Sequence, residues 1–109
     1  MAQRIGSRPD LDALIVSSPV LATDVADPAV EASKAFSGQI DALAEKLPAV
    51  TWARAELSAM PDLASIFGIE AAPALLLFRE RVGLNAGPAT FSPAQFEALV
   101  RQRPRAGHG

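Results

Sequence analysis

The sequence predicts an α/β fold, a three-layer α/β/α sandwich with a central mixed β-sheet. Helix and strand patterns alternate along the first half of the 109 residues, which favours parallel strands with helices on both faces. Residues 74–78 (ALLLF) form an uninterrupted apolar run, typical of a strand that is buried on both sides. A weaker strand pattern over 83–86 follows closely enough for an antiparallel hairpin, so we expect a mixed sheet.

The first half of the chain predicts two helices and one strand. The pair Asp27-Pro28 places Asp27 as the N-cap of a long helix whose apolar residues recur at steps of three and four. Ser37-Gly38 predicts a kink within that helix. The expected segments are, in order, a loose N-terminus over 1–8, a helix from Pro9 to the break at 17–19, a strand over 19–26 and a helix from Asp27 to Leu47.

The second half predicts three strands and two helices. Gly68 is the expected C-cap of a short helix, and Ser92 with Gln95 fits a capping box with Pro93 at the first helical position. No repeat or linker divides the chain, so residues 1–109 are expected to form one domain. The expected segments are a strand over 49–57, a helix from Asp62 to Phe67, a strand over 74–78, a turn over 79–83, a strand over 83–86, a helix from Ser92 to near Arg103-Pro104 and a loose tail over 104–109.

The apolar residues that share the inward phase of each predicted element form the expected core. Trp52 is likewise expected to pack within the fold and not to serve as a ligand platform. The expected core residues are Val20, Leu21, Phe36, Ile40, Leu43, Leu63, Phe67, Leu75, Leu77, Phe78 and Leu99.

Two scarce residue types exclude several kinds of chemistry. The chain has no cysteine, which excludes disulfides, thiolate metal sites and a cysteine nucleophile. Its one histidine, His108, is next to the C-terminus, so neither a Ser-His-Asp triad nor a multi-histidine metal site is expected. Asp24, Asp27 and Glu31 form an acidic trio, but their spacing matches no calcium loop. We therefore expect no cofactor and no metal.

The charge pattern argues against nucleic acid and membranes as partners. The net charge is −2, and residues 1–100 alone hold seven basic and twelve acidic residues. A nucleic-acid surface needs clustered basic residues, and the arginines near the C-terminus are interpreted as a solvated tail. No apolar run approaches the ~20 residues of a membrane span, and no secretory signal follows Arg4 and Arg8, so we expect a cytoplasmic protein.

One segment is similar to a known family. Residues 61–78 (PDLASIFGIEAAPALLLF) combine a short helix that ends in Gly68-Ile69, then Pro73, then an apolar strand that ends in Phe78. This pattern resembles the thioredoxin family, in which a helix ending in Gly-Ile precedes a cis-proline and the central strand. The resemblance extends over residues 10–103. It implies a thioredoxin-like fold, a cis peptide bond before Pro73 and a buried acid at Asp24.

The resemblance breaks at the family's reactive motif. The Cys-x-x-Cys of thioredoxins falls at residues 30–33, where Val30 replaces the attacking cysteine and Ser33 the resolving one. Dithiol exchange needs a thiolate and a second thiol. Val30 has no nucleophile, and no histidine is near Ser33 to activate its hydroxyl. We therefore expect no oxidoreductase activity and no catalytic residue.

The resemblance also implies a binding role that needs no sulfur. Thioredoxins hold peptides between the start of the active-site helix and the cis-proline loop. The expected function is a redox-inactive module that binds a protein or peptide, as a chaperone, adaptor or assembly factor, and the same patch suits a homodimer contact. The expected groove residues are Ala29, Val30, Ser33, Ala71, Ala72 and Pro73.

Alternative interpretations stay open at this point. The chain is also compatible with a thioredoxin-fold enzyme that uses Ser33 for chemistry other than dithiol exchange, or with a relative of the oxidoreductases in name alone. Ser33 is equally explained as a hydrogen-bonding residue in the first turn of a helix. Asp24 has no cysteine to serve and is interpreted as a vestigial acid, either half-exposed as a helix cap or buried as a carboxyl.

Overall fold

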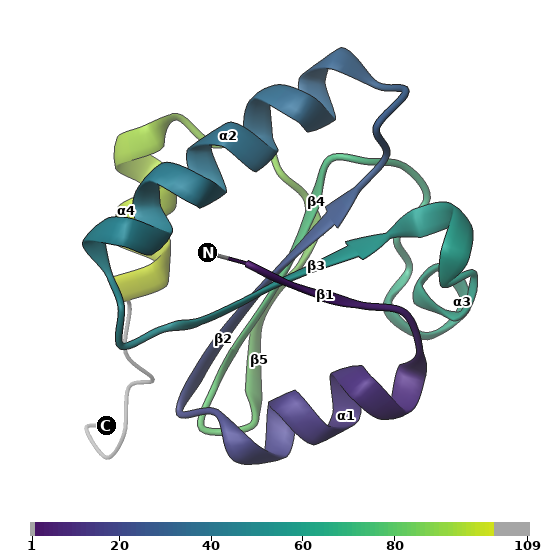
Figure 1. Cartoon of the computed structure of the whole chain (residues 1–109), viewed down its shortest axis with the longest axis horizontal. Helices are drawn as coiled ribbons and strands as arrows, with labels where there is room; N and C mark the ends of the chain where they lie inside the picture. Colours follow the sequence, from purple (N-terminus) through teal and green to yellow (C-terminus); the bar gives the residue numbers. More distant parts are fainter. Residues whose placement is uncertain (1, 102–109) are drawn as a thin grey trace.

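Five strands form one mixed β-sheet in the computed structural model, which describes residues 2–101 (Figure 1). The strand order is β1-β3-β2-β4-β5. Strands β1, β3 and β2 are parallel, whereas β4 is antiparallel to both β2 and β5. The α/β fold with a mixed sheet is therefore confirmed. The strands are β1 (Gln3–Ile5), β2 (Val20–Ala26), β3 (Thr51–Glu56), β4 (Ala74–Arg79) and β5 (Val82–Pro88).

Helices cover both faces of this sheet. The pair α2 and α4 packs on one face, and the pair α1 and α3 packs on the other (Figure 1). None of the described helices has the length and apolarity needed to span a membrane. The helices are α1 (Arg8–Ser17), α2 (Glu31–Lys46), α3 (Asp62–Phe67) and α4 (Pro93–Arg101), with a 3-10 turn, η1 (Leu57–Ala59), before α3.

Each face of the sheet has its own apolar core. Phe36 and Ile40 of α2 meet Phe96 of α4 over one face, and Leu11 of α1 and Leu63 of α3 lie over the other. The predicted core is confirmed, since every predicted residue is at least partly buried. Those that are buried are Val20, Leu21, Phe36, Ile40, Leu43, Leu63, Leu75 and Leu77, and those that are partly buried are Phe67, Phe78 and Leu99.

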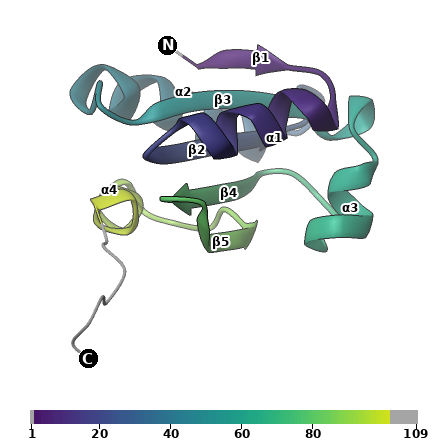
Figure 2. The ribbon, with the colours of Figure 1, turned by 90° about the horizontal axis from the view of Figure 1, so that it is seen from below.

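The prediction of a loose N-terminus over 1–8 is wrong at Gln3–Ile5, which form a strand. Gln3–Ile5 pairs in parallel with Ala53–Ala55 and makes β1 an edge strand of the sheet. Ile5 is buried in the core beneath α1, so tertiary packing holds a strand too short to show an alternating pattern. Figure 2 shows β1 and β5 at opposite edges of the sheet.

The predicted start of the long helix is also wrong. Helix α2 begins at Glu31, and its N-cap Val30 makes no side-chain capping bond. Asp27 does not cap the helix, because its Oδ1 accepts a hydrogen bond from the Ala29 N–H at 2.9 Å and closes a separate turn. The helix continues without interruption through Ser37 and Gly38.

The C-terminal elements follow the predictions closely. Ser92 and Gln95 exchange both bonds of the capping box, and Gly68 ends α3 with a φ of 71°. Strand β5 is longer than the predicted 83–86, and a register shift between Leu77 and Phe78 interrupts its pairing with β4. The predicted helix end near Arg103-Pro104 and the tail over 104–109 lie outside the described residues.

Candidate functional site

The loop between α3 and β4 is held at both ends and free in the middle. Ile69 is buried under the sheet face and anchors the loop after the left-handed Gly68. At the far end, the Ala89 N–H donates to the Pro73 carbonyl at 3.0 Å. The Ala72–Pro73 peptide bond is cis. The loop therefore starts and ends on the rigid scaffold of the sheet.

A cavity of about 660 Å3 opens beside this loop, and we call it the Pro73 groove. One wall is Ala32 in the first turn of α2, and the opposite wall is the end of β5 with the residues that follow it. Small apolar side chains dominate the surface between these walls. The lining residues are Ala32, Gly68, Ile69, Glu70, Ala71, Ala72, Pro73, Ala74, Gly87, Pro88, Ala89 and Thr90.

The backbone of Glu70–Ala72 is not used by the fold. Within residues 2–101, no backbone N–H or carbonyl of these three residues takes part in a hydrogen bond. Ala71 is exposed and Ala72 is partly exposed, so their polar groups are open to solvent. An extended segment can pair with such free groups as a strand does at a sheet edge.

The first turn of α2, beside the groove, also has unpaired backbone donors. Ser33 and Lys34 donate their backbone N–H groups to the Val30 carbonyl, whereas those of Glu31 and Ala32 have no acceptor among the described residues. Helices leave such N–H groups open at their first turn unless a side chain caps them. Val30 cannot do this, since its side chain has no acceptor.

The predicted groove residues divide into two sets. Ala71, Ala72 and Pro73 line the groove together. Ala29 is exposed and Val30 is half-buried on the turn before α2, and neither lines the cavity. The predicted apolar patch is therefore built mainly from the loop, with Ala32 in place of Val30 on the helix side.

The sequence predicts Ser33 in the groove, and the structure corrects this prediction. The side chain is 1% exposed, and its Oγ accepts a hydrogen bond from the Asp27 N–H at 2.9 Å. Ser33 lines a different cavity of about 330 Å3 on the other side of α2, together with Ser37 and Arg54. Because α2 starts at Glu31, Ser33 faces the sheet and ties the end of β2 to the helix.

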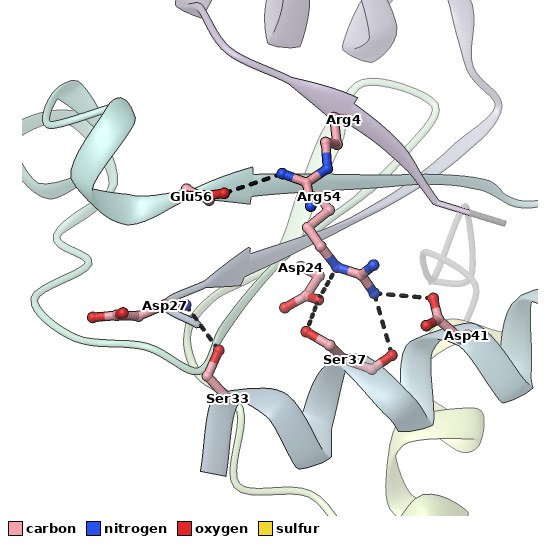
Figure 3. Close-up of polar contacts among 8 residues, drawn as sticks. All are labelled: Arg4, Asp24, Asp27, Ser33, Ser37, Asp41, Arg54 and Glu56. Atoms are coloured by element: carbon pink, nitrogen blue, oxygen red, sulfur yellow. Dashed lines mark hydrogen bonds and ion pairs between the residues drawn. The ribbon is translucent and has the colours of Figure 1, made fainter. Parts of the chain in front are cut away.

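Asp24 lies beneath α2 as a fully buried carboxylate, 0% exposed, and does not cap a helix (Figure 3). Its Oδ2 accepts a hydrogen bond from the Ser37 hydroxyl at 2.6 Å and one from the Arg54 Nε at 2.7 Å. Its Oδ1 has no partner among the described residues. The side chain of Arg54 is 20% exposed, so this ion pair is largely shielded from water.

Arg54 connects β3 to β2, through Asp24, and to α2. Its Nη2 donates to the Ser37 carbonyl at 3.2 Å and to the Asp41 Oδ1 at 3.0 Å, both on α2 (Figure 3). Burial alone would lower the pKa of the guanidinium, but the hydrogen bonds and charges of Asp24 and Asp41 outweigh burial and raise that pKa. Arg54 therefore remains a permanent cation that holds α2 on the sheet.

Two residues of this region were missed from the sequence. Arg54 lies opposite Asp24 in the parallel register of β2 and β3. Asp24 is the one charged residue of β2, whereas β3 carries both Arg54 and Glu56. An acid in one predicted strand and a base in the next were the available signal. Glu70 in the groove carries no sequence signal beyond its place between Ile69 and Pro73.

The acidic trio does not form a metal site. Asp24 is bound to Arg54, and Asp27 closes the turn before α2. Glu31 pairs with Lys34 at 3.1 Å on the helix surface. In the part of the chain that the structure describes, no three His, Cys, Asp or Glu side chains gather in a way that would hold a metal ion.

Comparisons with known proteins agree on one fold. A protein of Streptomyces coelicolor named as a thioredoxin 2 is 30% identical over 69 residues, which cover 63% of this chain and 52% of that protein. The match thus spans about half the length of that curated relative. No protein-family model matches the chain.

Solved structures of thioredoxins superpose on nearly the whole chain. A variant thioredoxin from Halobacterium salinarum gives a TM-score of 0.82 at 17% identity, covering 91% of this chain and 87% of its own. The thioredoxin of Fasciola hepatica gives 0.80 at 16% identity, covering 93% and 99%. At such low identity these structures show the shared fold alone.

Proposed function

We propose that this chain, a relative of the thioredoxin family that has the thioredoxin fold and no cysteine, binds a protein or peptide segment in the Pro73 groove. The observation that carries the proposal is the free backbone of Glu70–Ala72 on the wall of a small apolar cavity. Such a surface supplies main-chain hydrogen bonds and pockets for alternate side chains. A chaperone, an adaptor or an assembly factor would use it in this way.

The absence of cysteine separates peptide binding from thiol–disulfide exchange. With no cysteine in 109 residues, the chain has no thiolate to attack a disulfide and no second thiol to release a mixed disulfide. A bound segment would therefore leave with its disulfides and thiols unchanged.

An enzyme that uses Ser33 is the weaker alternative. A serine nucleophile needs access to substrate and a base to take its proton. Ser33 is buried, its Oγ holds the Asp27 N–H, and it does not line the groove. These three observations favour a structural role for this hydroxyl.

Filling the groove tests the proposed function. Ala71 is exposed, so Ala71→Trp should block the groove while changing the free energy of unfolding by no more than ~0.5 kcal/mol. Peptides selected for binding from a random octapeptide library should shift the backbone amide NMR signals of residues 69–72 and of Gly87, Ala89 and Thr90. We expect Ala71→Trp to weaken these peptides about tenfold or more.

Ala13→Trp is the matched control, because Ala13 is an exposed alanine on α1, away from the groove. It should bind the selected peptides as the unmodified chain does. Equal binding by both tryptophan variants, or shifts confined to other surfaces, would remove the groove from consideration. Failure to select any peptide that reaches residues 69–73 would count against the function itself.

A further inference from the structure

We infer that the segment held in the Pro73 groove carries a lysine or arginine beside small apolar residues, an inference that rests on the proposed binding function. The groove supplies one kind of charge only. Among its lining residues, Glu70 is the single charged side chain, and no basic residue lines the cavity. A cationic partner is the chemistry that this surface complements.

Glu70 is free to accept such a partner. The residue is exposed, and within residues 2–101 it makes neither an ion pair nor a hydrogen bond. It begins the stretch Glu70–Ala72 whose backbone is unpaired. A segment that pairs with this backbone would therefore bring its side chains next to the Glu70 carboxylate.

The first turn of α2 adds no net negative charge to the groove. Glu31 precedes Ala32 of the groove wall, and its side chain is 88% exposed. Lys34 offsets Glu31 in part through their ion pair. The helix N-terminus contributes a partial charge of about +0.5, which the Glu31 carboxylate also opposes. Glu70 thus remains the one charged side chain among the residues that line the groove.

The small side chains that line the groove indicate which other residues the bound segment carries. Alanine, glycine and proline side chains leave room for small apolar groups against the wall, whereas the carboxylate is at the exposed rim. A lysine or arginine can lay its aliphatic stem along such a wall and keep its charged end in water near Glu70. Acidic segments would meet repulsion at the same position.

Because the Glu70 carboxylate is exposed, its contribution is modest and depends on salt. Exposed ion pairs change an equilibrium constant by roughly two- to fivefold at low ionic strength, and screening reduces this at high salt. The discriminating measurement is therefore a comparison of matched peptides, in which only the charge differs.

The experiment extends the octapeptide selection. The selected sequences should be enriched in lysine and arginine over aspartate and glutamate. For each of several binders, a matched peptide with every Lys or Arg changed to Gln is titrated against the unmodified chain, Glu70→Gln and Glu70→Lys. Glu45→Gln is the control, since Glu45 is an exposed acid near the other end of α2 with no ion pair among the described residues.

We expect the unmodified chain and Glu45→Gln to prefer the basic peptides by about two- to fivefold at low salt, and we expect this preference to vanish in Glu70→Gln. Glu70→Lys should reverse it. If peptides bind at residues 69–73 but show no basic preference, or keep it in Glu70→Gln, the inference is wrong and the proposed function stands. If no peptide binds there, the proposed function fails, and the inference fails with it.

Discussion

At the scale of single residues, the most consequential arrangement is the ion pair of Asp24 and Arg54. A buried carboxylate is costly unless a cation and hydrogen bonds compensate it. Arg54 and Ser37 provide that compensation, and Arg54 also reaches Asp41 on the same helix. This chain has no thiol on which Asp24 could act. Its hydrogen bonds to Arg54 and Ser37 instead join β2 to β3 and α2, which is a structural role.

Removing the cation tests that role. Arg54→Met keeps the aliphatic stem but leaves Asp24 buried without its counter-charge, so the free energy of unfolding should fall by roughly 3 kcal/mol. Urea denaturation measures the loss. The double variant Asp24→Leu/Arg54→Met removes both charges and should recover most of it. A single variant as stable as the unmodified chain would show that the pair is dispensable.

At the scale of elements, each boundary follows from local backbone chemistry or from packing. Where the chemistry is local, the sequence predicts it well. Gly68 ends α3, and the capping box begins α4. The two wrong predictions have different causes. Strand β1 forms because it pairs with β3, which the sequence of three residues does not show. Helix α2 starts three residues beyond Pro28 because Asp27 closes a turn of its own before the helix.

Alanine substitutions at two glycines should change the free energy of unfolding in opposite directions. At Gly68 the φ of 71° disfavours any Cβ, so Gly68→Ala should destabilise the fold by about 1 kcal/mol. Gly38 is inside α2, and an added Cβ would meet no heavy atom within 4 Å. Gly38→Ala should therefore stabilise the fold by roughly 0.5–1 kcal/mol. Thermal unfolding of both variants checks the signs, and a loss at position 38 would contradict the role assigned to helix propensity.

In the candidate site, too, residues close together in the sequence could be predicted, whereas contacts between distant residues could not. The loop residues Ala71, Ala72 and Pro73 are contiguous, and their place in the groove could be predicted from the motif that surrounds them. Asp24 and Arg54 are 30 residues apart and meet only once β2 and β3 are aligned. Ser33 was misplaced because its direction depends on where α2 begins.

At the scale of the whole molecule, the thioredoxin fold occurs here in a chain that has no cysteine. We predict that the pure protein reduces insulin with dithiothreitol no faster than dithiothreitol alone, since no residue of the chain can form a mixed disulfide. Turbidity of the released insulin chains follows the reaction, with a cysteine-containing thioredoxin as the positive control. A rate above the reagent background would require a nucleophile that this sequence does not contain.

The interrupted pairing of β5 bears on how the molecule behaves at high concentration. Edge strands are templates for further strands, and proteins that leave them flat and apolar are prone to aggregate. Strand β5 carries no charged residue, but the register shift near Leu77 breaks its regularity at one end, and Pro88 lacks an N–H at the other. Only a few residues between these two points can add a strand. The sheet is thereby protected against open-ended growth along its longer edge, with no charge placed there for that purpose.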